Sequence, residues 1–455
     1  MNSKLKYKFS ILITKTLTGL IQYFNIGSGT NFPGRIGRKI APDILSHLVK
    51  QSKKEIIVVT GTNGKTTTAG FISNILNAAD RKIAHNKMGA NMLTGLTAAI
   101  IQDSNLNAEL DTDHCLLEID EAYFARAVDE FNPNLLVITN LFRDQLDRYG
   151  ELDTTAKKIK EAISKTITKK PLKVILNADD PIVASITYNK EVENIYFGFK
   201  EVTFVGQDKD VKSPQEAATC RCGEKYNYSR IFYGHIGHYS CSCGISRPVP
   251  DVEATAKIGV TSSEITIYSK KLGEFTVKVN MPGLYNAYNA LASITACIEL
   301  GISSTDIING LGNYSTIFGR AELINLKGKP VLIQLIKNPI GATEVLRTVK
   351  DDKNSKLLII INDNYADGRD VSWLWDANFE LLAGHEKQIV TSGIRASDMA
   401  VRLKYAGIDK DNLKIIDNIN DAVKYSLANV HENEKLYILP TYTALLQLQK
   451  ILSNK

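Results

Sequence analysis

Residues 56–68 read Ile-Ile-Val-Val-Thr-Gly-Thr-Asn-Gly-Lys-Thr-Thr-Thr, and no other stretch of the chain is as informative. The first four residues are apolar and β-branched, which is typical of a buried strand. A helical-looking stretch follows at residues 66–79. Glycines between a strand and a helix let backbone N–H groups converge on phosphate oxygens, and the helix N-terminus adds partial positive charge. The order strand, glycine loop, helix therefore predicts a phosphate-binding loop.

The side chains of this loop indicate how it would hold a nucleotide. Lys65 would reach the β- and γ-phosphates, and the Thr66 hydroxyl would sit on a Mg²⁺ ion. The usual spacing has a first glycine where this chain has Val59, so the loop is a shortened variant that starts at Gly61. A plain glycine turn is the alternative, but Gly-Lys-Thr at a strand-to-helix junction is rarely accidental. The residues expected to contact ATP in this loop are Thr62, Asn63, Gly64, Lys65, Thr66 and Thr67.

The composition is that of a folded, mildly basic chain. Its 455 residues suggest roughly three domains. With 44% apolar and 23% charged residues, a packed globular core is expected. The net charge of +6 is spread along the sequence, so it does not by itself argue for nucleic acid. Six cysteines are few for this length and require no oxidising compartment, and a cytoplasmic location fits the use of ATP.

Residues 1–40 are expected to form an amphipathic helix and a lead-in to the first domain. Lys4, Lys6 and Lys8 precede an apolar run that Lys15 interrupts, so the segment resembles a signal peptide only briefly. Helical spacing instead relates a set of apolar residues, namely Leu5, Phe9, Leu12, Ile13, Leu17, Leu20 and Phe24. We expect this face to pack on the protein itself, and contact with the inner face of an anionic membrane is the alternative.

Short apolar strands alternate with helical stretches over residues 55–200 and again over residues 330–455. Such alternation implies an α/β fold with mostly parallel sheets and helices on both faces. We predict a central P-loop domain at residues 41–318, a small cysteine-rich insertion within it at residues 215–247, and a second α/β domain at residues 319–455. The expected strands are residues 56–60, 114–119, 135–139, 174–177, 195–197, 264–268, 275–279, 331–336, 357–361, 388–391, 413–416 and 435–439, and the expected helices include residues 66–79, 154–167 and 286–300.

Four of the six cysteines lie in two pairs within the insertion. Cys220 and Cys222 form one Cys-x-Cys-Gly motif, and Cys241 and Cys243 form the other. A glycine after each pair lets the backbone turn toward the thiolates, which is typical of the two knuckles of a zinc ribbon. A closed shell of four thiolates would make the Zn²⁺ structural rather than catalytic. A redox pair or free dithiols are the alternatives, and two histidines between the pairs could also be ligands.

Further short motifs follow the loop in order along the chain. Leu-Glu-Ile-Asp-Glu at residues 117–121 contains Glu118, and Gly-Leu-Tyr-Asn-Ala-Tyr-Asn at residues 283–289 contains Asn286. The remaining motifs occupy residues 138–140, 144–150, 177–181, 319–322 and 337–339. Together with the Thr-Gly-Thr-Asn-Gly-Lys-Thr-Thr loop, this series resembles the Mur ligases and the folylpolyglutamate synthases over residues 33–345.

The resemblance implies roles for residues outside the loop. Glu118 would bind Mg²⁺ together with Thr66. Asn286 would contact the nucleotide, and Arg320 would approach the phosphates when the last domain closes. Lys157, at a shorter spacing than usual, would correspond to the carbamylated lysine of the ligases.

Two features narrow the resemblance, namely the cysteine insertion and residues 362–376, which read Asn-Asp-Asn-Tyr-Ala-Asp-Gly-Arg-Asp-Val-Ser-Trp-Leu-Trp-Asp. With them, nearly the whole chain is similar to the Mur-ligase-like subunits of the lipid II isoglutaminyl synthases of Gram-positive bacteria. That similarity implies an ATP-dependent ligase that amidates the α-carboxylate of D-glutamate in the lipid II stem peptide to D-isoglutamine. The carboxylate would be activated as an acyl phosphate, with Lys65, Glu118 and Mg²⁺ stabilising charge on the transferring phosphoryl group.

The ammonia for this reaction would come from a partner. Cys115 and Cys297 lie in apolar surroundings without the context of a nucleophile, so the chain has no convincing amidase of its own. The resemblance implies a GatD-type glutaminase subunit, whose Cys–His pair needs an acid from this chain to orient the histidine. Asp370 is our first candidate for this acid, with Asp367 and Asp363 behind it. The alternative is that these aspartates belong to a solvated turn.

Three other functions compete with this interpretation. A stand-alone amino-acid ligase such as a folylpolyglutamate synthase would need neither the cysteine knuckles nor the acidic loop. A zinc-ribbon ATPase acting on nucleic acid would need a basic face with interleaved aromatic residues, which the sequence does not clearly offer, so no nucleic-acid partner is expected. A non-catalytic scaffold would not need an intact Lys65, Thr66 and Glu118.

Overall fold

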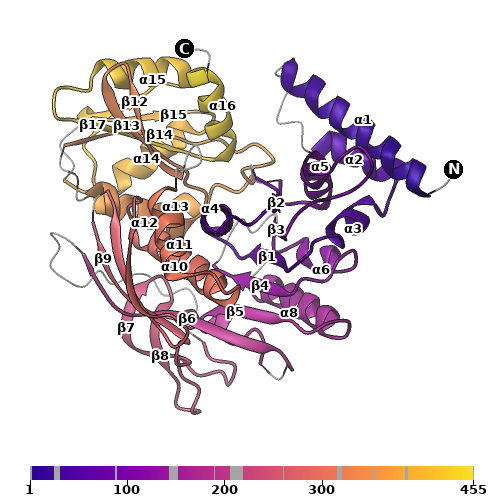
Figure 1. Cartoon of the computed structure of the whole chain (residues 1–455). Coiled ribbons are helices and arrows are strands. Elements are labelled where there is room, and N and C mark those ends of the chain that lie inside the picture. The colour runs from indigo at the N-terminus through magenta and orange to yellow at the C-terminus, as the bar shows by residue number, and fades with distance from the viewer. Residues whose placement is uncertain are drawn as a thin grey trace.

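The structure is a computed structural model of the 455-residue chain. It describes all residues except 1–2, 25–30, 88–89, 143–151, 189, 205–218, 260, 315–319, 351, 353, 385–387 and 454–455. Two sheets organise the chain, one with nine strands from residues 56–279 and one with six strands from residues 320–440 (Figure 1). The α/β class with a central and a C-terminal domain is confirmed.

The central sheet has the strand order β11-β10-β9-β6-β5-β4-β1-β3-β2. Its strands are β1 (Ile56–Thr60), β2 (Ile83–His85), β3 (His114–Glu118), β4 (Leu135–Ile138), β5 (Lys173–Asn177), β6 (Glu193–Phe204), β9 (Val252–Ile258), β10 (Ser263–Ser269) and β11 (Gly273–Val279). The strands from β2 to β9 run parallel, and β10 and β11 add an antiparallel edge. The strand order reverses around β1, where an open α/β sheet usually binds its ligand.

Helices cover both faces of this sheet. On one face lie α4 (Lys65–Ala78), α10 (Leu284–Glu299) and α11 (Ser304–Gly312), and on the other lie α3 (Ile44–Val49), α5 (Leu93–Asp103), α6 (Phe124–Ala127), α8 (Leu152–Ile167) and α9 (Pro181–Ala184). Because side chains alternate along a strand, Ile57 and Val59 of β1 pack with α4, whereas Ile56 and Val58 pack in the opposite core. The apolar run at residues 56–59 is therefore buried on both faces, which holds the loop after it rigidly.

The C-terminal sheet has the strand order β12-β13-β17-β14-β15-β16, with β12 antiparallel at its edge and the others parallel. Its strands are β12 (Arg320–Leu326), β13 (Lys329–Gln334), β14 (Ser355–Ile360), β15 (Ile389–Ser392), β16 (Leu413–Ile415) and β17 (Lys435–Pro440). Its helices are α12 (Pro339–Lys350), α13 (Trp373–Asp376), η1 (Phe379–Leu382), α14 (Ala396–Tyr405), η2 (Lys410–Asn412), α15 (Ile419–Ala428) and α16 (Tyr442–Ser453). Each predicted strand and helix in both domains overlaps an observed one.

Two further elements lie outside these layers (Figure 1). The hairpin of β7 (Asn227–Tyr233) and β8 (Ile236–Ser240) is inserted between β6 and β9, and it carries the cysteine pairs at its open end. At the N-terminus, α1 (Ser3–Tyr23) packs on α2 (Asn31–Ile40) and α5. Of the helices that the structure describes, none combines the length and apolarity needed to cross a bilayer.

The N-terminal helix is confirmed, but the prediction that its apolar face packs on the protein is wrong. The side chains of Leu5, Phe9, Leu12 and Leu20 are exposed, and Phe24 just after the helix is exposed as well. Ile13 and Leu17 are half-buried. Small side chains make up much of the covered face, because α2 approaches α1 closely at Gly37.

Candidate nucleotide site and cysteine cluster

The loop between β1 and α4 has the backbone shape that phosphate binding requires. Gly61 and Gly64 have positive φ values of 128° and 83°, which glycine adopts without strain. A Cβ atom on Gly64 would lie 2.0 Å from Oδ1 of Asn289 on α10. Glycine therefore allows both the tight turn and the close approach of α10 to the loop.

Asn63 in this loop is held by segments that are distant in sequence. Its backbone N–H donates to Oδ1 of Asn140 at 3.0 Å, and its side-chain Oδ1 accepts from Nδ2 of Asn338 at 3.0 Å. Nζ of Lys337 also donates to the carbonyl of Thr62 at 3.3 Å. Because Lys337 and Asn338 directly precede α12, the C-terminal domain contacts the phosphate loop itself.

Lys65 begins α4 and forms a buried ion pair. Its Nζ lies 2.9 Å from Oε2 of Glu121 and donates to the carbonyl of Gly61 at 2.5 Å. The two paired side chains are only 10% and 2% exposed. Burial opposes the charge on Lys65, but the carboxylates of Glu121, Asp120 and Glu118 outweigh it and raise the pKa of the ammonium group. Lys65 is therefore a fixed cation, and Glu121 supplies the negative charge that a phosphate could supply.

Thr66 and Glu118 meet beside this pair. Oγ1 of Thr66 donates to Oε1 of Glu118 at 2.9 Å, and Glu118 ends β3 with almost no exposed surface. Asn86 fixes the backbone of Glu118 through two hydrogen bonds of 2.8 Å. Mg²⁺ prefers oxygen ligands and usually keeps several waters, so one hydroxyl and one carboxylate make a sufficient protein contribution. The two residues expected to bind Mg²⁺ are therefore in direct contact.

A pocket beside the loop is bordered by α10 and the C-terminal domain. It contains Asn286, whose Nδ2 donates to the carbonyl of Pro282 at 2.7 Å. Arg320 begins β12, and its backbone pairs with Gln334 of the pocket wall. The lining residues from the loop and from the C-terminal domain include Asn63, Gly64, Thr67, Gln334, Lys337 and Glu344. The fold thus brings four of the residues expected to contact ATP, namely Asn63, Gly64, Thr67 and Asn286, to one cavity.

The four cysteines of the insertion converge. Sγ of Cys220 lies 3.7 Å from Sγ of Cys243, and Sγ of Cys222 lies 3.5 Å from Sγ of Cys241. All four sulfur atoms lie within 4.8 Å of one another. Four thiolates around a tetrahedral Zn²⁺ with Zn–S bonds of about 2.3 Å would be about 3.8 Å apart. The cluster therefore fits a Zn²⁺ ion with a closed shell.

The tip of the cysteine-bearing hairpin reaches the phosphate loop. Nε2 of His235 lies 3.2 Å from Oδ1 of Asp180, and both side chains are fully buried. A Cβ atom on Gly234 would lie 2.9 Å from the ring of Phe142. The N–H of Phe142 in turn donates to Oγ1 of Thr62 at 3.1 Å. Hence the β7–β8 hairpin connects the cysteine cluster to the loop through a short chain of contacts.

The acidic loop at residues 362–376 begins at the carboxyl end of β14. Oδ2 of Asp363 forms an ion pair with Nη2 of Arg395 at 2.7 Å. Asp367 is buried and accepts from the backbone N–H of Thr443 at 2.7 Å. Asp370 is half-buried and accepts from the backbone N–H of Ser372 at 2.8 Å. Asp363 and Asp367 thus bind distant parts of the C-terminal domain, and Asp370 accepts a hydrogen bond within the loop and is less buried than Asp367.

Aromatic side chains are exposed around this loop. Tyr365 is 81% exposed, Trp375 54% and Tyr405 74%. The rings of Trp375 and Tyr405 make an edge contact, with centroids 5.6 Å apart. Trp373, by contrast, is half-buried and packs against the core of the domain. The chain's two tryptophans therefore have different environments, and only Trp375 points outward.

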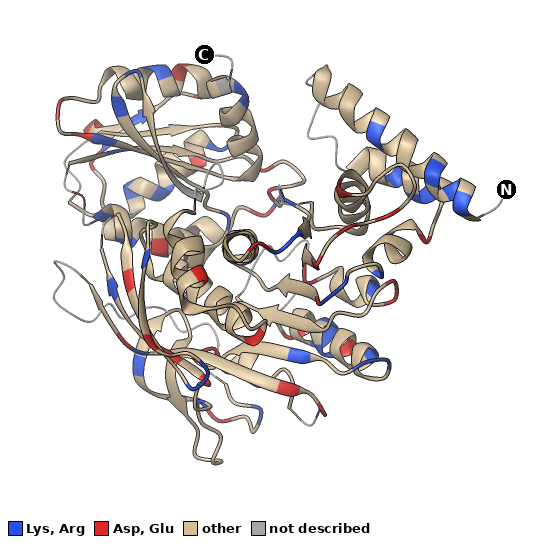
Figure 2. Ribbon diagram, in the orientation of Figure 1, with Lys and Arg blue, Asp and Glu red and all other residues tan. Residues whose placement is uncertain are grey.

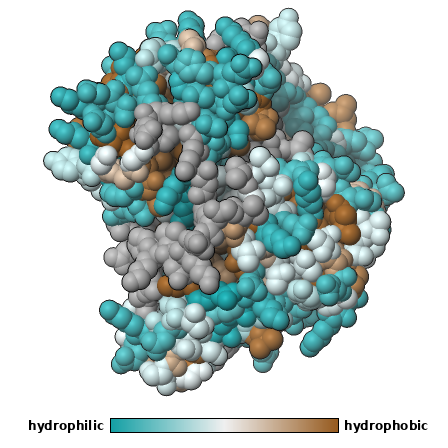
Figure 3. All heavy atoms as spheres, turned by 90° about the vertical axis from the view of Figure 1, so that its left-hand side faces the viewer, coloured by the Kyte–Doolittle hydropathy of each residue, from teal (hydrophilic) through white to brown (hydrophobic). Residues whose placement is uncertain are grey.

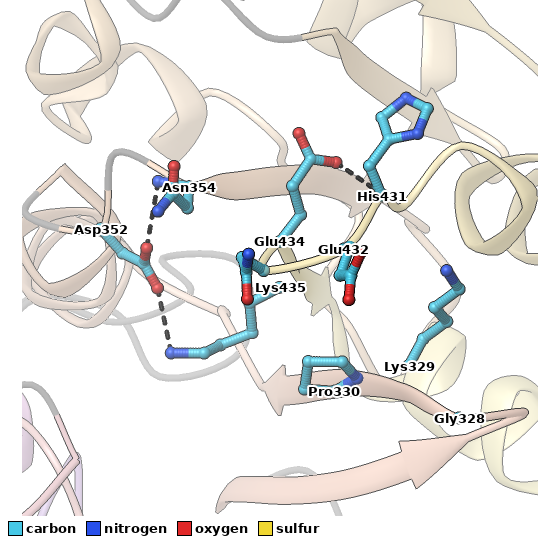
Figure 4. Close-up of a pocket in the computed structure, with 10 residues that line it drawn as sticks. Gly328, Lys329, Pro330, Asp352, Asn354, His431, Glu432, Glu434 and Lys435 are labelled. Carbon is cyan, nitrogen blue, oxygen red and sulfur yellow. Dashed lines mark hydrogen bonds and ion pairs between the residues drawn. The ribbon is translucent and has the colours of Figure 1, made fainter.

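A second pocket, of about 650 Å³, lies at the other end of the C-terminal sheet (Figure 4). It surrounds the amino-terminal ends of β13 and β17, where Nζ of Lys435 lies 3.0 Å from Oδ2 of Asp352. The backbone N–H of His431 donates to Glu434 within the same wall. Ligands of open α/β sheets bind at the carboxyl ends of the strands, so this pocket is not a candidate for the reaction.

Some expected residues lie elsewhere, and some contacts were not predicted. The motif at residues 144–150 lies outside the described residues, and Lys157 is exposed on α8. Glu121 closes the Leu-Glu-Ile-Asp-Glu motif, and its role as the ion-pair partner of Lys65 does not follow from that motif. Asn140 and Asn338 belong to the motifs at residues 138–140 and 337–339. Only their places in these motifs indicate that they contact the phosphate loop.

Comparison with known proteins agrees with this geometry. The chain matches a sequence model of the Mur ligase middle domain at residues 59–297 and one of the MurT ligase C-terminal domain at residues 335–445. Among solved structures, a pseudomurein peptide ligase type C from Methanothermus fervidus superposes with a TM-score of 0.68 at 24% identity, covering 91% of this chain and 80% of that one. This likeness shows the fold alone.

Two curated relatives extend over most of the chain. The MurT subunit of lipid II isoglutaminyl synthase (glutamine-hydrolyzing) from Staphylococcus aureus (strain COL) is 36% identical, with 84% of each chain covered. The subunit of the same name from Streptococcus pneumoniae (strain ATCC BAA-255 / R6) is 35% identical, with 94% of each chain covered. With this identity over this length, the chain belongs to the MurT family of Mur-ligase-like proteins.

Proposed function

We propose that this chain is the ATP-dependent synthetase subunit of a lipid II isoglutaminyl synthase. The proposal is supported by its family and by one observation in particular. The buried pair of Lys65 with Glu121 and the partly buried pair of Thr66 with Glu118 lie side by side at the carboxyl edge of the central sheet. They would supply a cation for the phosphates and oxygen ligands for Mg²⁺, which phosphoryl transfer requires.

The proposed substrate is the α-carboxylate of D-glutamate in the stem peptide of lipid II. A carboxylate does not accept ammonia at neutral pH, because the leaving group would be oxide. Transfer of the γ-phosphoryl group of ATP to the carboxylate gives an acyl phosphate and ADP. Ammonia then attacks the acyl carbon, phosphate leaves and the nitrogen loses a proton, which gives D-isoglutamine.

The residues of the loop would divide this work. Lys65 would release Glu121 and pair with the phosphates, while Thr66 and Glu118 would ligate Mg²⁺. The backbone of residues 62–67 would hold the phosphate oxygens at the N-terminus of α4. Asn286 would contact the nucleotide from α10.

The C-terminal domain would complete the nucleotide site. Its strand β12 starts at Arg320, opposite Gln334 of the pocket wall, and Lys337 already reaches the loop. Arg320 would approach the phosphates as this domain closes over the nucleotide. The Cys220, Cys222, Cys241 and Cys243 thiolates would hold a structural Zn²⁺ that stiffens the β7–β8 hairpin.

A glutaminase partner of the GatD type would supply the ammonia. The relatives' printed names call each of them a subunit of a glutamine-hydrolysing enzyme. We propose that Asp370 orients the catalytic histidine of that partner, and that exposed Trp375 and Tyr405 lie in the interface, since aromatic residues anchor many protein interfaces. The complex would work in the cytoplasm, at the inner face of the membrane that carries lipid II.

One reconstitution tests the proposal and its main alternative. The purified chain is mixed with ATP, Mg²⁺ and lipid II, and either the glutaminase partner with glutamine or an ammonium salt is added. Mass spectrometry should find amidated lipid II in both arms. Addition of an amino acid instead of ammonia would identify a stand-alone ligase, and absence of product from a folded chain in both arms would contradict the proposal.

A further inference from the structure

The N-terminal helix α1 is attached to the protein by small polar side chains, by buried Ile11 and by Tyr7, which stacks on His47 and donates to Asp43 at 2.5 Å. Ser10, Ile11, Thr14 and Thr18 are buried, and Oγ of Ser10 donates to the carbonyl of Gly37 on α2 at 2.9 Å. A Cβ atom on Gly37 would lie 2.5 Å from Oγ1 of Thr14. Glycine at this position therefore lets the two helices approach closely, and the covered face of α1 is narrow and mostly polar.

The large apolar side chains of α1 lie on the opposite face. Leu5, Phe9, Leu12 and Leu20 are 48–55% exposed, and Tyr23 is 83% exposed. Their spacing places them on one side of a helix, and we call these five residues the outer stripe. On the face turned toward the viewer in Figure 3, hydrophobic residues lie instead in small patches between hydrophilic ones. An aligned apolar stripe on a helix is typical of an interaction surface.

Basic side chains border the outer stripe. At about 100° per residue, Lys4, Lys8 and Lys15 lie along one side of it and Lys6 along the other. The helix Ser3–Tyr23 contains no aspartate or glutamate. Figure 2 shows the basic residues of α1 gathered toward its N-terminus. Lys15 is half-buried and donates to main-chain carbonyls rather than to a carboxylate.

We propose that α1 docks this protein on an anionic lipid surface, with the helix axis parallel to the membrane plane. An apolar stripe that reaches the acyl boundary, between lysines that contact the headgroups, is the chemistry of an interfacial helix. Lys4, Lys6 and Lys8 flank the stripe near the N-terminus of α1, and the apolar side chains that continue to Tyr23 would keep the rest of the helix in the membrane plane. The face that binds α2 stays on the protein, so docking requires no rearrangement of the fold.

Charge complementarity selects a lipid surface over the other possible occupants. A second copy of this chain would bring the same lysines against each other, because its α1 is also purely basic. A protein partner would need an acidic border around an apolar groove. Docking itself follows from the surface of α1, and only its biological role rests on the proposed function. That role would be to hold the synthetase at the membrane where its proposed substrate is anchored.

Vesicle sedimentation of the full-length chain tests the proposal. Vesicles of phosphatidylcholine alone are compared with vesicles that also contain phosphatidylglycerol. We expect binding to be about tenfold tighter on the anionic vesicles, and about tenfold weaker for Leu12→Asn/Leu20→Asn than for the unaltered chain. The matched control is Leu323→Asn/Leu446→Asn, which changes two leucines of similar exposure outside α1 and should bind as the unaltered chain does.

Four outcomes would overturn the proposal. These are equal binding to neutral and anionic vesicles, equal loss in the control variant, loss of glutaminase binding by the α1 variant, and an α1-dependent dimer of this chain. Ammonia-driven amidation of a water-soluble, lipid-free substrate fragment is measured in parallel and should be unchanged by the α1 variant. Failure of that reaction in the unaltered chain would contradict the proposed function but leave the vesicle result standing.

Discussion

The phosphate loop and the acidic loop share a local plan but differ in what surrounds them. Each follows the carboxyl end of a buried parallel strand, β1 or β14, and each turns at a glycine with a φ of 83°, Gly64 or Gly368. In the phosphate loop, charged side chains are buried and paired with residues from distant segments, as Lys65 is with Glu121. Around the acidic loop, aromatic rings such as Trp375 remain exposed.

The difference indicates two kinds of partner. The phosphate loop is enclosed by α10 and the C-terminal domain, and its contacts come from this chain, so it suits a small ligand. In the acidic loop, Asp363 and Asp367 are bound within their own domain, whereas the rings of Tyr365 and Trp375 are exposed. Exposed aromatic rings suit contact with a second protein. The predictions below separate these two roles, because a change in one loop should leave the reaction of the other intact.

The largest effect is expected at Lys65. Lys65→Ala removes the cation that we propose to face the transferring phosphoryl group, and should lower ammonia-driven amidation by about 10⁴-fold. Glutamine hydrolysis by the complex should persist. The readouts are amidated lipid II by mass spectrometry and glutamate release from glutamine.

A double variant separates catalysis from folding at this site. Lys65→Ala alone leaves the buried carboxylate of Glu121 unpaired, which costs about 3–5 kcal/mol of stability. Lys65→Ala/Glu121→Gln should recover most of the thermal stability but none of the amidation. If this stable double variant amidates lipid II at a rate within tenfold of the unaltered enzyme, Lys65 has no essential role in the reaction.

The next largest effect is expected at Asp370. Asp370→Asn should lower glutamine hydrolysis by the complex about 10³-fold, because the partner's histidine would lose the acid that orients it. Ammonia-driven amidation should be unchanged. Asp376→Asn, an exposed aspartate of the same loop, is the control and should affect neither reaction. Unchanged glutaminase activity in Asp370→Asn would refute the assignment of this acid.

A smaller effect is expected at the hairpin tip. Gly234→Ala places a Cβ against Phe142 and strains a residue with a φ of 55°, so it should weaken ATP binding about tenfold through Thr62. Gly273→Ala strains a φ of 73° in open space and should leave ATP affinity unchanged. Calorimetric titration of ATP into both variants measures the difference, and equal affinities would show that the hairpin does not position the loop.

The last effect acts on stability rather than on activity, and it concerns pH and Glu344 in the pocket wall. Burial, opposed by Arg347, raises the pKa of its carboxyl from 4.5 to about 7. The folded chain therefore holds this proton more tightly than the unfolded chain. Its contribution to stability is complete below pH 4.5 and is lost as the pH rises through about 7, by up to about 3 kcal/mol.

Thermal unfolding across this pH range tests that contribution. The melting temperature of Glu344→Gln should fall less between pH 5 and pH 7 than that of the unaltered chain. Lys65→Ala/Glu121→Gln provides the comparison at Glu121, another of the buried carboxylates of the site. If the melting temperatures of Glu344→Gln and of the unaltered chain fall equally with pH, the raised pKa of Glu344 is contradicted.

The sequence predicts the frame of the molecule because the relevant patterns are local. The β-branched run at residues 56–59 and the glycines after it specify a buried strand and a turn regardless of the rest of the fold. The two Cys-x-Cys-Gly motifs specify knuckles in the same way, and their sulfur atoms converge as a zinc ribbon requires. The partner of Lys65 could not be chosen from sequence, because Glu118 and Glu121 are both acidic residues near the end of one strand.

The N-terminal helix shows a second limit of sequence patterns. Its amphipathicity identified the apolar side, from Leu5 to Leu20, but not which side the protein covers. The covered side is decided by close packing of Ser10 and Thr14 against Gly37, and small residues contribute little to a hydrophobic pattern. A stripe of serine and threonine facing a glycine of the next helix was the available signal.

Calorimetry of Mg²⁺–ATP binding to the full-length chain tests the central claim most directly. We expect saturable, magnesium-dependent uptake that is lost in the folded Lys65→Ala/Glu121→Gln variant and retained in Asp370→Asn. A folded, unaltered chain that takes up no nucleotide, either alone or in complex with the proposed glutaminase partner, would contradict it.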